Sequence, residues 1–259
     1  MIRFKKYIHF FSVFFLLPFL IKAQEGTRTT TTSGSTQTGK IMLVPFEPKL
    51  YMSEIDQKVN QQTKWNFNQI RENFRHQLDA QLKLKLQSIA PVVSFYSDST
   101  KMTKDLEYTY LSSNLSYDPV TQPSSATAPT KKQEGIKNGQ VAVEINNDKK
   151  FMNTKLPNLE VLNYLNNKYK VEYFVFVNEL DITTMMNSYD ISSDTYQRQV
   201  AVHYSILDKT GKTISAGLAT STFSSKENNP KKIVSSTFTP IASSIASKLA
   251  VIINPPKEK

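Results

Sequence analysis

Five consecutive apolar or aromatic residues, YFVFV at 173–177, constrain the fold of this chain more than any other feature. Polar residues flank the run, which is long enough for a β-strand and far too short for a membrane-spanning helix. A strand without polar alternation buries both of its faces, as strands near the centre of a helix-covered sheet do. We therefore predict a central strand over residues 171–177, with its phenylalanine and valine side chains on opposite faces.

Amphipathic segments on either side of this run predict the cover. Apolar residues recur at three- and four-residue steps over 64–89, which predicts a long helix with Thr63 as its N-cap. The same spacing over 230–253 predicts a closing helix, capped by Asn229 and kinked or split at Pro240. These two helices have the only apolar stripes large enough to cover the two faces of the central strand.

Shorter patterns complete the expected fold. We predict strands at 40–46, 91–96 and 141–145, helices at 100–113 and 156–170, and a hairpin over 198–223 with its turn at DKTG. Two strand–helix units followed by a hairpin and a helix predict the α/β or α+β class. The sheet should be mixed and partly parallel, covered by helices, with the hairpin nearer an edge.

The amino terminus has the layout of a secretory signal peptide. A basic start, MIRFKKY, leads into the apolar stretch IHFFSVFFLLPFLI, and Ala23 precedes a cut site before Gln24. An amino-terminal membrane anchor is the alternative, because the apolar stretch is long. The proline within the stretch, the small residue at its end and the polar sequence that follows favour cleavage. We expect export to the periplasm, with outer-membrane association or secretion as alternatives.

Composition divides the chain into segments. Residues 1–23 are the expected signal peptide, and 24–39 are a flexible linker rich in Thr, Ser and Gly. A single domain is expected over 40–253, with a mobile Pro- and Ser-rich insertion at about 114–140, followed by a tail at 254–259.

The chain contains no cysteine and has a net charge of +10. The lack of cysteine excludes disulfides, thiolate metal sites, a cysteine nucleophile and lipid attachment through cysteine. The basic residues are dispersed, which is typical of a solvated surface and leaves weak contact with an anionic envelope surface as a further option. We expect no nucleic-acid partner.

Few residues could carry chemistry. His9 lies in the expected signal, His76 on the long helix and His203 on the polar face of a hairpin strand, so a surface or hydrogen-bonded role is the simplest interpretation. Glu179 and Asp181 share a strand face and could bind a cation or share a proton, although a solvated strand end is simpler. No catalytic, phosphate-binding or zinc-binding motif occurs. We predict no catalytic residue, no cofactor and no metal site.

Aromatic residues give a weaker indication of a binding surface. Trp65, Tyr204 and the tyrosine-rich stretch at 108–117 could mark such a surface, and core packing explains Trp65 equally well.

Several motifs together resemble a group of cell-envelope domains. The resemblance rests on KIMLVPFEP running into a long helix, PVVSFY, YKVEYFVFVNEL, the hairpin VAVHYSILDKTGKTISAG and a last amphipathic helix. The group comprises the TolB amino-terminal domain, the curli-secretion lipoprotein CsgG and the lipoprotein activators of penicillin-binding proteins. The resemblance covers 40–113 and 141–252. It departs from the group in lacking a lipidated cysteine, in carrying Asn178 where a glycine is usual and in the insertion at 114–140. It implies an envelope interaction or assembly domain without catalysis.

We therefore expect an exported, non-enzymatic cell-envelope protein that binds another envelope protein or associates with itself. One alternative is an enzyme that acts on an envelope polymer, with Glu and Asp as acid and base. The other is a carbohydrate- or lipid-binding module.

Overall fold

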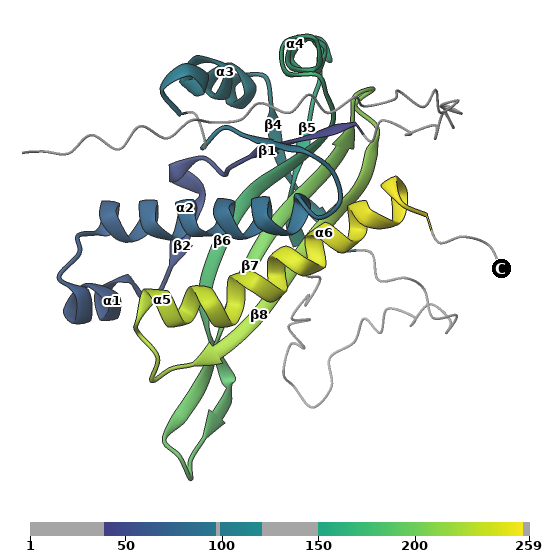
Figure 1. Ribbon diagram of the computed structural model, residues 1–259. Helices are drawn as coiled ribbons and strands as arrows, with labels where there is room; N and C mark the ends of the chain where they lie inside the picture. Colours follow the sequence, from purple (N-terminus) through teal and green to yellow (C-terminus); the bar gives the residue numbers. More distant parts are fainter. Residues whose placement is uncertain (1–38, 97–98, 121–149, 256–259) are drawn as a thin grey trace, which may run out of the picture. The chain divides into compact units, whose positions relative to one another are not determined.

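A computed structural model describes residues 39–96, 99–120 and 150–255. Their main feature is a mixed sheet in the order β3–β1–β6–β7–β8, with β2 paired to β6 beyond the end of β1 (Figure 1). The strands of this sheet are β1 Lys40–Val44, β2 Tyr51–Ser53, β3 Val92–Ser94, β6 Val171–Asp190, β7 Thr195–Asp208 and β8 Thr213–Ser224. The pairings of β1 with β3 and of β6 with β1 and β2 are parallel, whereas β6, β7 and β8 pair antiparallel. The fold is α/β or α+β, as predicted, with the hairpin β7–β8 at one edge.

Six α-helices and a second, smaller sheet complete the described part of the chain. The helices are α1 Asp56–Thr63, α2 Phe67–Leu86, α3 Ser99–Leu111, α4 Glu160–Tyr169, α5 Pro230–Ile233 and α6 Thr239–Ile253. A 3-10 turn covers Pro48–Leu50, and a π-helical turn, Val234–Phe238, joins α5 to α6. The smaller sheet is an antiparallel pair, β4 Asn114–Pro119 and β5 Lys150–Lys155.

The predicted central strand lies in the middle of the sheet but is much longer than 171–177, because β6 continues to Asp190. Phe174 and Phe176 face one side and the neighbouring valines face the other, as predicted. Beyond this run the alternation resumes with Leu180 and Ile182, which return to the valine side. The continuous apolar run at 173–177 is shorter than β6 because the second half of this strand has one apolar face and one polar face.

The helices cover the sheet in a way that the sequence did not predict. Both large helices, α2 and α6, lie on the same face and pack against each other (Figure 1). The ring of Phe74 on α2 also lies 5.8 Å from that of Phe238, in the π-helical turn that leads into α6. The opposite face receives the smaller helices α3 and α4, through residues such as Met102 and Leu165, beside Phe174. One large helix on each face, as expected from the apolar stripes, is therefore wrong. The phenylalanines of β6 need only small helices as cover.

The helix predicted over 64–89 is observed as α2, which begins at Phe67 and ends at Leu86. Lys64 has φ 65°, which ends α1, and the cap of α2 is Asn66 in a reciprocal capping box with Gln69 rather than Thr63. Phe67, which the periodicity placed on the apolar face, is 63% exposed in the first turn.

The closing helix follows the prediction. The Asn229 side chain accepts hydrogen bonds from the amides of Lys231 and Lys232, and Pro230 occupies the first turn. Pro240 falls in the first turn of α6, directly after the π-helical turn, so the helix is interrupted by a π turn beside the proline but runs on without a break from Pro230 to Ile253. By length and composition Pro230–Ile253 could cross a membrane. Its apolar stripe nevertheless packs into the core of the α2–α6 face, which is how a core helix behaves.

Two predicted segments have other outcomes. Residues 114–119, expected to belong to a mobile insertion, form β4, because they pair with β5 along their whole length. The strand expected at 141–145, the signal and linker at 1–38, including His9, and most of the tail lie outside the described residues.

Candidate functional site

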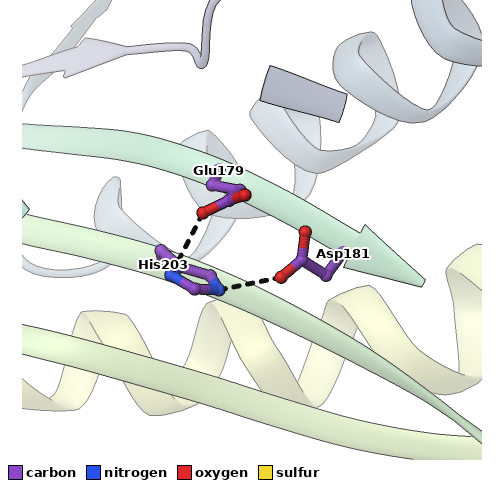
Figure 2. A group of neighbouring side chains, drawn as sticks. All are labelled: Glu179, Asp181 and His203. Carbon is purple, nitrogen blue, oxygen red and sulfur yellow. Dashed lines mark hydrogen bonds and ion pairs between the residues drawn. The ribbon is translucent and has the colours of Figure 1, made fainter. Parts of the chain in front are cut away.

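A group of polar side chains lies on the second face of the sheet, beneath β5. Glu179 and Asp181 of β6 share one face, as their spacing predicted, and His203 of β7 lies beside them, which the sequence did not predict (Figure 2). A β-bulge at Asn178 produces this arrangement, since the β6–β7 register shifts between Val177 and Glu179. The extra residue changes the phase of the strand, so the two carboxylates turn away from the α2–α6 core.

The group is buried rather than solvated. Glu179 and His203 are each 4% exposed, and Asp181 is half-buried. The expectation that Glu179 lies at a solvated strand end is therefore wrong, because β5 and β4 cover this part of β6 and β7. One carboxylate oxygen from each acidic residue and one imidazole nitrogen of His203 lie within 4.8 Å of one another.

Hydrogen bonds assign the protonation state of His203. The Met152 backbone N–H donates to Nδ1 of the ring at 2.7 Å, so Nδ1 is an acceptor and carries no proton. The proton is then on Nε2, which donates to Asp181 Oδ2 at 3.0 Å. The imidazole is neutral in this arrangement. The Glu179 carboxylate, 3.5 Å from Nδ1, faces a nitrogen whose lone pair is already engaged.

Glu179 has a different partner. The Tyr117 hydroxyl of β4 donates to the Glu179 carboxylate, 2.9 Å from each oxygen. Burial and the neighbouring Asp181 charge raise the pKa of Glu179, and the Tyr117 hydrogen bond partly offsets that shift. Burial, together with the Glu179 contact, raises the pKa of Tyr117 to about 12.

The same face holds β5 in place through side chains. The amide of Thr154, two residues after Met152, donates to Ser205 Oγ at 3.0 Å, and Ser205 lies two residues after His203. Asn178 completes the set, since its Nδ2 donates to the Met152 carbonyl at 2.7 Å. The side chains of His203, Ser205 and Asn178 thus bond the Met152 N–H, the Thr154 N–H and the Met152 C=O of β5. In an ordinary sheet, the backbone of a neighbouring strand would bond these groups.

A second contact strengthens the attachment at Asn178. Its Oδ1 accepts from the Thr154 hydroxyl at 2.6 Å, and its Nδ2 also lies 2.8 Å from Ser205 Oγ. The Asn178 amide is therefore saturated by β5 and β7, which explains why a polar residue is stable at the bulge of a buried strand.

The hydrogen bonds argue against a cation at the Glu179–Asp181–His203 group. A metal bound at Nε2 requires the proton on Nδ1, where it would oppose the Met152 N–H. Asp181 Oδ1 is buried without a partner among the described residues, but a single free oxygen does not make a coordination sphere. As they are placed, Glu179 holds β4 through Tyr117, and His203 holds β5 through the Met152 amide.

Among the described residues, the hollows lie away from the Glu179–Asp181–His203 group. A hollow of about 370 Å³ lies at the β7–β8 turn beside Lys209, and another of about 260 Å³ lies beside Trp65. Neither is lined by Glu179, Asp181 or His203. Acid–base catalysis by the two carboxylates would need access that β5 and Tyr117 occupy.

The other residues that the sequence singled out are dispersed. His76 is exposed on α2 and contacts the Tyr96 ring, while Trp65 is half-buried at the rim of the core. Tyr204 is buried on the α2–α6 face. In the tyrosine-rich stretch, Tyr108 packs edge-on to Tyr164 on α4, so the structure brings none of them to the polar group except Tyr117.

Sequence reasoning missed the partners that matter most. Tyr117 was assigned to a loop, and neither Asn178 nor Ser205 was given a role. One signal was available, since the apolar positions change from odd numbers, Val175 and Val177, to even numbers, Leu180 and Ile182. That change of phase predicts a bulge between them.

No protein-family model matches the chain, and no curated protein shows significant similarity to it. The resemblance to envelope domains is therefore carried forward only as part of a proposal.

Proposed function

We propose that this is an exported, non-enzymatic cell-envelope protein that acts by binding another protein or assembling with itself. The observation that carries the proposal is a projecting hairpin, residues 185–195, which we call the arm. Beyond Ile182 and Gln197 the strands β6 and β7 pair only with each other, because β2 and β8 end there (Figure 1). An isolated hairpin contributes nothing to the core, so its sequence is free to serve recognition.

Large apolar side chains project from the arm. Met186 is 79% exposed, Tyr189 54% and Ile191 84%. Methionine and aromatic residues are enriched at protein interfaces, and exposing several of them together has a solvation cost that binding removes.

The tip of the arm is also held in one conformation. Asp190 accepts hydrogen bonds from the Ser192 and Ser193 hydroxyls, which lower the pKa of Asp190 to about 2. Tyr189 donates to Asp194, and Lys226 of the β8 end reaches the Ser193 carbonyl. A preformed loop loses less conformational entropy on binding than a flexible one.

Site-specific photo-crosslinking in the producing cell tests the arm. A photoreactive residue at Ile191 should capture a partner, whereas one at Leu111, which is 87% exposed on α3, should not. Adducts from neither Ile191 nor Met186, or equal adducts from Leu111, would remove the arm as the binding surface. The export part is tested by amino-terminal sequencing, which should begin near Gln24; an intact Met1 in the membrane fraction would identify an anchor instead.

One observation favours a second candidate, the carbohydrate-binding module. The hollow of about 260 Å³ is lined by Trp65, Asn73, Gln77, Lys231 and Val234. An aromatic ring beside two amides and an ammonium provides a stacking surface and several hydrogen-bonding groups for a sugar ring. Trp65 is the single tryptophan, so its fluorescence reports binding directly. Titration with soluble fragments of envelope glycan should change the emission of Trp65 if this hollow binds sugar. Unchanged emission would contradict this candidate function.

A further inference from the structure

The two edges of the main sheet differ in length and in chemistry. β3, at one edge, has three residues, whereas β8, at the other, has twelve. Natural sheets protect their edges with short strands, charges, prolines or bulges, because unpaired backbone groups attract another strand. The sequence of β8, TISAGLATSTFS, contains no charged residue and no proline. Its edge therefore has little of the usual protection.

The hydrogen-bond pattern shows which groups of β8 point outward. Ser225 N donates to the Tyr196 carbonyl opposite it, so that pair is a hydrogen-bonded pair of the antiparallel ladder. Hydrogen-bonded pairs alternate with non-bonded ones, and the register between β7 and β8 is unbroken from Gln197↔Ser224 to Ile206↔Ser215. The residues of β8 whose backbone groups face away from β7 are therefore Ala216, Leu218, Thr220 and Thr222.

Within the described part of the chain, the outward N–H and C=O groups of these four residues have no hydrogen-bond partner. Their side chains are half-buried or exposed, so the edge is accessible from the side. Lysines flank the strand at Lys212 and Lys226, outside the uncharged segment. Flanking charges of this kind oppose slippage to registers that extend beyond the strand.

We propose that the β8 edge pairs antiparallel with the β8 edge of a second copy of this chain. An identical strand offers the same four residues in the opposite order, so a two-fold axis at Ala219 pairs Ala216 with Thr222 and Leu218 with Thr220. Each pair then exchanges two backbone hydrogen bonds, and no charged side chain within the strand lies opposite another. Lys212 of one copy lies opposite Lys226 of the other just outside each end of the paired segment, so the ladder is not expected to extend further. An uncharged strand has no charge pattern with which to select a different partner, whereas a second copy matches it in length and in hydrogen-bonding groups.

The inference deepens the proposed function by naming a second copy as a partner, but it uses a different surface from the arm. Either can therefore fail alone. An Ile191→Asp variant should lose arm adducts and keep the β8 pairing, and β8 variants should do the reverse.

Sedimentation equilibrium of the protein purified from the exported fraction tests the pairing. The wild-type chain should have the mass of a dimer. Thr220→Pro removes one outward N–H from each copy and is sterically tolerated at such an edge position, so it should halve the mass while circular dichroism stays unchanged. Thr220→Val keeps the N–H and should remain dimeric. A wild-type monomer up to roughly 100 μM, far above the Kd of a stable complex, or a dimer that persists in Thr220→Pro, would overturn the proposal.

Crosslinking gives an independent answer, also if Thr220→Pro fails to fold. Because the chain has no cysteine, Thr220→Cys introduces a single thiol. In the proposed register the two copies of this residue are diagonal neighbours about 7–8 Å apart, within reach of a short bis-maleimide. Thr213→Cys, at the start of the strand, lies opposite residue 225, so its two copies are about 40 Å apart along the paired strands. Dimer from Thr220→Cys and none from Thr213→Cys is expected; equal yields from both, or none from Thr220→Cys, would overturn the register and with it the proposal.

Discussion

The two faces of the main sheet are covered by different means. On one face α2 and α6 bury a continuous apolar cluster that includes Phe74, Phe238 and the valines of β6. On the other face an apolar half lies under α3 and α4, and a polar half carries β5 on the side chains of Asn178, His203 and Ser205. The first face depends on matched volume and tolerates adjustment, whereas the polar half depends on particular donor and acceptor atoms at fixed distances.

Truncation of a ring on the apolar face should have the largest effect. Phe74 is fully buried between Tyr51 and Phe238, so Phe74→Ala removes apolar contacts and leaves a cavity. We expect the free energy of unfolding to fall by about 3–5 kcal/mol. Urea unfolding at constant slope measures it, with the exposed Phe67→Ala as the matched control, expected to change it by less than about 0.5 kcal/mol. Equal losses in the two variants would mean that α2 is not seated as described.

Asp79 provides a test with the opposite expected sign, because its carboxyl is buried next to the apolar cluster of α2 and α6 and replacing it should stabilise the fold. Burial raises the pKa of Asp79 to about 6, although the Ser94 hydroxyl donates to it. The folded pKa lies above the unfolded value, so ionised Asp79 destabilises the fold above pH 6, and stability is regained as the pH falls from 6 towards 4. Asp79→Asn should raise the free energy of unfolding at pH 7.5 by at most about 3 kcal/mol, the equivalent of that shift.

The effect of Asp79→Asn should shrink to roughly 0.5 kcal/mol at pH 4, near the pKa of an unfolded aspartate, and disappear by about pH 3, where the wild-type carboxyl is protonated in both states. Thermal or urea unfolding across pH 4–8 would show the two curves converging in acid. Curves that stay parallel over the whole range would contradict the raised pKa of Asp79.

Asn178 tests the polar half of the second face. Its replacement should lower the free energy of unfolding, whereas Asp79→Asn should raise it. Asn178→Ala leaves the Met152 carbonyl and the Thr154 hydroxyl without their partner, so we expect a loss of about 2 kcal/mol. The control is Asn187→Ala on the exposed arm of the same strand, expected to stay within about 0.5 kcal/mol. If a neutral buried amide stabilises while a buried carboxylate destabilises, the contrast between the two sites is one of charge, because both groups are hydrogen-bonded. A loss no larger than that of the control would show that β5 does not depend on Asn178.

The smallest expected effect concerns Tyr117. Tyr117→Phe removes the hydroxyl that donates to Glu179, so the pKa of Glu179 should rise further while stability falls by about 1 kcal/mol. Carboxyl carbon chemical shifts, followed as a function of pH, measure the first effect, and urea unfolding measures the second. Tyr108→Phe, whose ring is exposed on α3, should leave both unchanged.

Apolar periodicity predicted most of the first face and little of the polar half of the second. The stripes of α2 and α6, the central position of β6 and the cap at Asn229 followed from spacing, because burial of apolar area repeats with the period of the element. The attachment of β5 could not be predicted in this way. It joins residues of β5 to His203 and Ser205, about fifty positions further along the chain, through single hydrogen bonds that leave no periodic signal.

The Glu179–Asp181 pair illustrates how far the sequence reaches. Its spacing correctly placed both carboxylates on one face, but the strand was expected to end in solvent there. Whether that face is wet depends on β4 and β5, and β4 was assigned to a loop because its residues, NLSYDP, include polar groups and a proline. A strand that pairs only with one other short strand has a weak pattern of its own.

The attachment of β5 through side chains has a consequence for local opening. Backbone ladders join β6, β7 and β8, so separating these strands means unfolding the domain. Between β5 and the sheet, by contrast, the described backbone groups meet side chains of Asn178, His203 and Ser205, which can exchange their partners for water by rotation. The small sheet can therefore lift away with the main one intact. The amides of Met152 and Thr154 should accordingly exchange their hydrogens with solvent faster than those of the paired core of β7, as one cooperative unit.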